Sequence, residues 1–117
     1  MVSITNATRG GAAVARCRVA HGLAERGVGL LRTPVLAPGE GLLIERAPSI
    51  HMFFMRYPID AVFMDADHRV VRVVAGLRPW GLVAWVPGAR DCLELPAGAA
   101  AAAGVQVGDQ LVVEEFE

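Results

Sequence analysis

The chain has no lysine, only two cysteines and few aromatic residues among its 117 positions. Its eleven basic residues are therefore all arginine, a bias that GC-rich coding explains together with the abundance of Ala, Gly and Val. The arginines are scattered among twelve acidic residues, and the net charge is −1. Because nucleic-acid-binding proteins use a basic stripe to displace counterions, neither a nucleic acid nor an anionic membrane is expected as a partner.

Long apolar runs are also missing. No run reaches the roughly 18 residues that a membrane helix needs. Residues 1–11 lack the basic start and apolar core of a secretory signal. Cys17 and Cys92 follow no CxxC pattern, so we expect two reduced, buried thiols, although spacing alone leaves one disulfide open. These absences favour a cytoplasmic protein without membrane contact.

Length and composition predict a single globular domain. Hydrophobic residues make up 54% of the chain and charged residues 20%, a balance typical of folded domains. A chain of this length buries about two thirds of its unfolded surface without a metal or a disulfide. We expect one domain over residues 12–117, preceded by residues 1–11 as an N-terminal extension or an edge strand.

Six segments have the alternating or β-branched pattern of strands. They are residues 12–19, 42–46, 61–64, 69–75, 91–95 and 110–116. Two short helices are expected, one over residues 21–31 and one in the alanine run that ends at Gly104, where glycine suits a left-handed C-cap. Since the elements show no regular βαβ alternation, we predict an α+β fold. Its mainly antiparallel sheet would be compact and barrel-like.

Residues 49–65 combine large apolar side chains with reactive or charged groups more than any other segment. They hold three of the four Met, three of the four Phe and the only Tyr. Arg56 lies within this apolar stretch near Asp60 and Asp65, and must be either solvated at a rim or paired. The favoured interpretation is an Arg–Asp pair that fixes the Tyr57–Pro58 turn. The alternative is a rim where Arg56 holds an anionic group.

Trp80 and Trp85 lie in a loop with Arg78, where they would form either an aromatic lip for a ligand or a cap over an open barrel end. We take the binding site to comprise the aromatic residues, the central Met and the charged pair of these two regions. Its predicted members are Phe54, Met55, Arg56, Tyr57, Asp60, Trp80 and Trp85.

Two other functions use overlapping residues. A small hydrolase would use Asp60 or Asp65 with His51 as acid and base. A copper carrier would use His51 and Met55, since imidazole and thioether suit Cu(I), but Met beside Phe more often fills a core. We therefore predict no metal site and no cofactor. The Asp65–Asp67 segment lacks the glycine and glutamate of a calcium loop, and a hairpin turn is expected there, with His68 solvated.

Five motifs in order resemble one known family. They are A-x(4)-ER-x-x-GL from Ala20, GLL from Gly41, H-x-F-x-M-R-x-x-I-D from His51, VFMDADHRVV, and LELPAG-x(5)-G-x-x-x-GD from Leu93. Over residues 12–115 the chain is similar to DUF192, a widespread group of small prokaryotic proteins of unknown function. The resemblance implies a compact β-rich domain with short helices. The family usually has Met and Trp where this chain has Leu31 and Phe54, and Phe54 lacks the indole donor.

These observations favour a non-catalytic module, because exposed aromatic residues and arginine occur without a clear nucleophile and base. Its ligand would be a small molecule or another protein. We expect a monomer or a homodimer.

Overall fold

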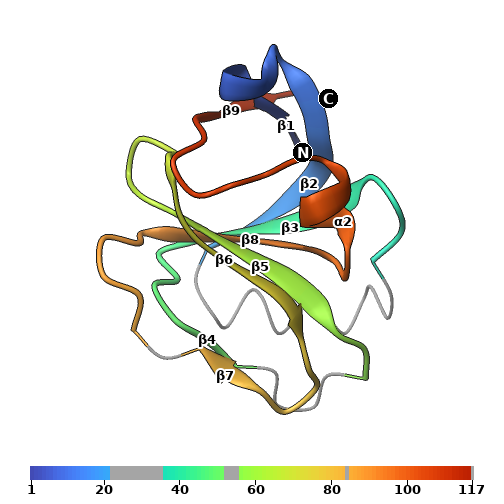
Figure 1. Cartoon of the computed structure of the whole chain (residues 1–117), viewed down its shortest axis with the longest axis vertical. Helices are drawn as coiled ribbons and strands as arrows, with labels where there is room; N and C mark the ends of the chain where they lie inside the picture. Colours follow the sequence, from blue (N-terminus) through green and yellow to red (C-terminus); the bar gives the residue numbers. More distant parts are fainter. Residues whose placement is uncertain (22–35, 52–55, 84, 117) are drawn as a thin grey trace.

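The computed structural model describes residues 1–21, 36–51, 56–83 and 85–116 (Figure 1). Within these ranges the chain forms nine strands, one 3-10 turn and one short helix. In chain order they are β1 Val2–Asn6, η1 Ala7–Arg9, β2 Ala12–His21, β3 Glu40–Glu45, β4 Ile50–His51, β5 Ile59–Met64, β6 Val70–Leu77, β7 Leu82–Val83, β8 Asp91–Pro96, α2 Ala99–Ala102 and β9 Leu111–Glu115.

Seven strands form one mixed sheet in the order β6-β5-β8-β3-β2-β1-β9, and β4 pairs with β7 in a separate two-stranded sheet. Most neighbours are antiparallel, as predicted, but β2 and β3 run parallel. A parallel pair needs a crossover of a dozen or more residues, and residues 22–39 are long enough to provide it. The hairpin predicted over residues 61–75 is confirmed as β5 and β6.

The large sheet does not close, so the barrel-like form is not confirmed. Its edge strands meet only near their first residues, through a bridge between Arg69 and Gln110. Two backbone hydrogen bonds flank this bridge: the Val70 amide donates to the Asp109 carbonyl at 2.9 Å, and the Leu111 amide to that of His68 at 3.0 Å. Figure 1 shows β1 and β9 at one end of the molecule and the β4–β7 ribbon at the other.

Two apolar clusters cover the two faces of the sheet. Val62 and Met64 of β5 belong to the first cluster, with Ala100 of α2. Ala61 and Phe63 alternate onto the opposite face and belong to the second, with residues of β3, β4 and β7. Because side chains of a strand alternate between faces, a strand covered on both sides is apolar throughout. The prediction that residues 61–64 are covered on both faces is therefore confirmed.

The N-terminal segment is part of the sheet. β1 lies between β2 and β9, so residues 1–11 are neither an extension nor an edge strand. The side-chain amide of Asn6 donates to the Asp109 carboxylate at 2.8 Å, which ties β1 to the chain just before β9.

One of the two predicted helices is described. The alanine run forms α2, and Gly104 follows it with a φ of 72°, as expected for a left-handed C-cap. The other prediction, residues 21–31, falls almost entirely outside the described residues, and His21 itself is the last residue of β2.

Candidate functional site

Three large apolar side chains are exposed close together in sequence on and beside β7. Trp80 is 58% exposed, Leu82 63% and Trp85 70%. We name these three residues the aromatic patch. The other exposed large apolar residues of the described chain, Met1 and Val107, lie in distant segments of the sequence. Large exposed apolar patches commonly mark interaction sites.

The patch lies on a two-stranded ribbon, formed by β4 and β7, that is anchored to the core. Val83 and Ile50 are paired across the ribbon and are both buried, which anchors it to the second apolar cluster. The Val86 amide also donates to the Pro48 carbonyl at 2.9 Å. Since alternate residues of a strand point to opposite faces, anchoring Val83 directs Leu82 to solvent.

Trp80 occupies a backbone position that favours glycine. The Gly81 amide donates to the Arg78 carbonyl at 2.9 Å, closing a turn whose second residue is Pro79. Trp80, the third residue, has a φ of 65°, as in a type II turn, where glycine is usual. A left-handed conformation costs a non-glycine residue about 1–2 kcal/mol. A large indole therefore occupies a position of the turn where a residue without a side chain would cost less.

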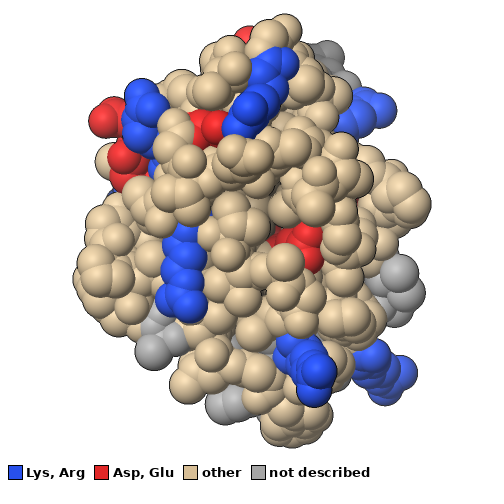
Figure 2. All heavy atoms as spheres, viewed as in Figure 1, with Lys and Arg blue, Asp and Glu red and all other residues tan. Residues whose placement is uncertain are grey.

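An exposed arginine, Arg78, belongs to the same turn as Trp80. A second exposed arginine, Arg56, lies three residues before Ile59, which pairs with Leu77 beside that turn. Residues 46–59 and 68–90 contain six arginines and no acidic residue. On the face shown in Figure 2, the end that carries β4 and β7 displays basic side chains and no acidic ones. The patch is therefore aromatic with basic surroundings.

Asp60 lies in the interior and not at a rim. Its exposure is 0%, and its two carboxylate oxygens accept hydrogen bonds from the backbone amides of Gly76 and Ala100, both at 2.9 Å. Within the described residues Arg56 forms no ion pair with Asp60, so the predicted Arg–Asp pair is wrong. The reason is that two long-range backbone donors satisfy the carboxylate instead.

The other predicted residues fall into three groups. Tyr57 is half-buried against the second apolar cluster. Asp65 accepts the amides of Asp67 and Arg69, both at 2.9 Å, which confirms the predicted hairpin turn. Phe54, Met55 and the side chain of His51 lie outside the described residues, so the histidine of the hydrolase and both ligands of the copper carrier remain predictions. In the described part of the chain, no group of three His, Cys, Asp or Glu residues could hold a metal ion.

Both cysteines are buried and neither forms a disulfide, as predicted. They belong to different apolar clusters and therefore lie on opposite faces of the sheet. Burial raises the pKa of Cys17 to about 12, so this thiol stays protonated near neutral pH and is a poor nucleophile.

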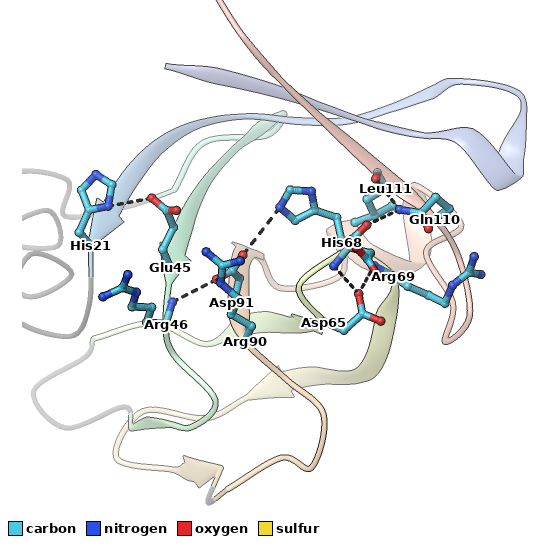
Figure 3. Close-up of polar contacts among 11 residues, drawn as sticks. His21, Glu45, Arg46, Asp65, His68, Arg69, Arg90, Asp91, Gln110 and Leu111 are labelled. Atoms are coloured by element: carbon cyan, nitrogen blue, oxygen red, sulfur yellow. Dashed lines mark hydrogen bonds and ion pairs between the residues drawn. The ribbon is translucent and has the colours of Figure 1, made fainter.

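A polar cluster that the sequence did not predict surrounds Asp91 (Figure 3). Asp91 is 2% exposed, and its Oδ1 accepts the Arg46 amide at 3.1 Å. His68 Nε2 lies 3.7 Å from Oδ2, and Arg90 Nε lies 3.7 Å from Oδ1. His68 was expected to be solvated, but its side chain is only 34% exposed. The Asp-Ala-Asp turn before His68 signals the positive φ of this residue, but not its contact with Asp91, which lies far along the chain.

The fold and the surface define a small domain with one open, mixed sheet and an exposed aromatic patch. In the described part, no helix is long and apolar enough to cross a membrane. The chain belongs to the DUF192 family, whose model, described as an uncharacterised ACR, matches residues 4–113.

Relatives and solved structures agree with this assignment. A UPF0127 protein of Thermococcus sibiricus is 31% identical over 115 residues, covering 92% of this chain and 72% of that protein. A UPF0127 protein of Pyrococcus abyssi is 38% identical over 63 residues, about half of each chain. A protein of unknown function from Novosphingobium aromaticivorans superposes with a TM-score of 0.78 at 27% identity, over 95% of this chain and 82% of that one. A putative transcription regulator from Sinorhizobium meliloti shares the fold, with a TM-score of 0.79 at 22% identity over 96% and 91% of the two chains.

Proposed function

We propose that this protein is a non-catalytic binding module whose aromatic patch docks an acidic, leucine-containing segment of a partner protein. The observation that carries the proposal is the exposure of Trp80, Leu82 and Trp85 on a ribbon anchored by buried residues. Tryptophan and arginine are the residues most enriched at interaction hot spots. The exposed arginines near the patch, and the absence of acidic residues from the surrounding sequence, favour a partner segment of negative charge.

The strained backbone of Trp80 supports this proposal. Strain at a single residue persists where the surrounding structure enforces it, and it is concentrated at functional sites. A residue selected only for stability at the third position of this turn would be glycine or asparagine. Retaining an exposed indole there is consistent with selection for contact with a partner.

The two tryptophans of the chain are both in the patch, so fluorescence excited at a wavelength that tryptophan but not Tyr57 absorbs reports on this site alone. We expect a synthetic peptide of Glu and Leu to change this fluorescence saturably, and peptides with Gln or Lys in place of Glu to bind at least tenfold more weakly. Because the tryptophan variants lose this signal, their binding is measured by the fluorescence anisotropy of the fluorescein-labelled Glu peptide. Replacing Trp80 by Asn and Trp85 by Ser should each weaken binding by about 30-fold, the loss of a hot-spot contact of about 2 kcal/mol.

Val107→Ser is the matched control, because Val107 is also exposed and apolar but lies in a distant segment of the sequence. Equal binding of the three peptides, or no effect of the tryptophan variants, would contradict the proposal. Tighter binding of a single-stranded oligonucleotide than of the Glu peptide would contradict the proposal and indicate a nucleic acid as the partner. Self-association that disappears in the tryptophan variants would make a second copy of the chain the occupant.

We also propose a cytoplasmic location for this module. The support is that the two buried cysteines form no disulfide, since secreted domains of this size more often form disulfides.

A further inference from the structure

We propose that Arg46, Arg90 and His68, arranged around the buried carboxylate of Asp91, form a binding site for a small oxyanion. The ligand class is a tetrahedral or planar anion with several acceptor oxygens: sulfate, phosphate or carboxylate. The site involves none of the residues of the aromatic patch and does not depend on the function proposed above.

Three separate elements deliver the three side chains. Arg46 follows the last residue of β3, Arg90 precedes β8, and His68 ends the turn between β5 and β6. Each contacts Asp91: Arg46 through its backbone amide at 3.1 Å, and Arg90 and His68 through side-chain nitrogens at 3.7 Å. Figure 3 shows the side chains of His68 and Arg90 at this carboxylate, whereas Arg46 approaches it with its backbone nitrogen and extends its guanidinium group away from it. Asp91 is thus a positioning residue, since it is buried and contacts the side chains of His68 and Arg90 and the backbone of Arg46.

Most hydrogen-bond donors of the two guanidinium groups remain unused. In the described part of the chain, the Arg46 guanidinium takes part in no hydrogen bond or ion pair. Among the described residues, the Arg90 guanidinium has one ion pair, at 3.7 Å with Asp91, and its side chain is 48% exposed. Each guanidinium carries five N–H donors in a planar fork that matches the oxygens of a carboxylate or phosphate. Donors from both forks are therefore accessible to an anion from solvent.

The acidic groups beside the site are already engaged. Asp91 alone does not balance Arg46 and Arg90, which leaves a local excess of positive charge. Asp65, in the turn that His68 ends, accepts the amides of Asp67 and Arg69. Glu45, the neighbour of Arg46 in the chain, has its Oε1 2.7 Å from His21 Nδ1. Figure 3 shows this carboxylate directed toward His21 and away from Asp91.

The backbone at the site is strained at two positions. Arg46 has a φ of 58° and His68 a φ of 64°, and neither residue is glycine. Only three non-glycine residues in the described part have a positive φ, so two of the three contact the same buried carboxylate. Such outliers concentrate at binding sites, where strain fixes the direction of a side chain. A turn selected only for stability would carry glycine at both positions.

The test uses sodium sulfate as the probe and the full chain labelled with nitrogen-15. Adding sulfate, with sodium chloride as the control at equal ionic strength, should shift the amide signals of residues 46, 68 and 90 saturably, with a dissociation constant of about 1 mM or tighter. Arg46→Gln and Arg90→Gln should each weaken sulfate binding at least tenfold. His68→Gln should weaken it by less, because one donor is kept.

Arg72→Gln is the matched control, because Arg72 is exposed on β6 and has no contact with Asp91. It removes the same charge and should leave sulfate binding unchanged. Arg90→Lys distinguishes fork geometry from charge: an intermediate affinity is expected if the guanidinium binds two oxygens. Shifts that never saturate, or that fall equally in the Arg72 variant, would overturn the proposal. Arg90 precedes β8 without backbone strain, so its variants keep the test valid even if Arg46→Gln unfolds the chain.

Discussion

At the scale of single residues, buried carboxylates dominate the polar interior of this protein. Asp60, Asp91, Glu94 and Asp109 are each 3% exposed or less. A buried carboxylate is tolerated only when its oxygens are hydrogen-bonded or paired. For Asp60 those partners are two backbone amides, which gives the residue a structural role.

Asp60→Asn tests this role directly. An asparagine side chain supplies one acceptor where the carboxylate supplies two, and its NH2 group would face a backbone N–H. We expect the free energy of unfolding to fall by about 2–3 kcal/mol, the range for losing a charged hydrogen bond and leaving a buried donor unpaired. Urea denaturation would measure it.

Asp67→Asn is a suitable control, since Asp67 is exposed in a turn. A stable Asp60→Asn protein that had lost only a catalytic activity would instead support the hydrolase hypothesis.

The sequence could not have predicted the partners of Asp60. They lie 16 and 40 residues further along the chain, in β6 and α2. Arg56 is close to Asp60 in the sequence, and this proximity led to the prediction of an Arg–Asp pair. The exposure of Trp80 and Trp85 was a stated alternative, because a loop rich in proline and glycine commonly lies at the surface.

At the scale of elements, the local sequence pattern was sufficient to predict the longer strands. All six predicted strand segments overlap β2, β3, β5, β6, β8 and β9. The two-residue strands β4 and β7 are too short to produce a periodic signal. The parallel pairing of β2 with β3 depends on the path of the intervening chain, which no periodicity encodes.

Gly41→Ala tests the packing between β3 and its two neighbours. A Cβ at residue 41 would lie 2.8 Å from the Glu94 carbonyl oxygen, 3.0 Å from Leu95 Cδ2 and 3.1 Å from Cys17 Sγ. The carbonyl belongs to a central strand and cannot move without disturbing the sheet. We therefore expect a loss of about 1–3 kcal/mol in the free energy of unfolding, typical of overpacking.

A double-mutant cycle with Cys17→Ala separates the two contacts. Removing the sulfur should recover only part of the loss, since the clash with the carbonyl remains. Full recovery would show that the thiol alone sets the space at this position.

At the scale of the whole molecule, the open sheet is joined at one end by contacts between distant parts of the chain. Asp109 is central to them: its carboxylate accepts Asn6 Nδ2 at 2.8 Å, the Gln106 amide at 3.0 Å and Arg9 Nε at 3.3 Å. These contacts tie η1 and the end of β1 to the turn before β9. Since Arg69 and Gln110 bridge the sheet edges beside this turn, Asp109 links the N-terminal segment to the region where the edges meet.

Acid should weaken this junction in a way that depends on Asp109. The hydrogen bond from Asn6, with the Gln106 amide and Arg9, holds the pKa of Asp109 below its usual value despite burial. A carboxyl whose pKa is lowered in the folded state stabilises the fold above its unfolded pKa of about 3.9, and this contribution is lost as the pH falls through the folded value. The stability advantage of the natural protein over Asp109→Asn should therefore be greatest near neutral pH and shrink below about pH 4. Urea midpoints of both proteins between neutral and acid pH would measure it. Because every other carboxyl is common to both proteins, the difference between them isolates Asp109. A difference independent of pH would mean that the charge of Asp109 contributes nothing to the junction.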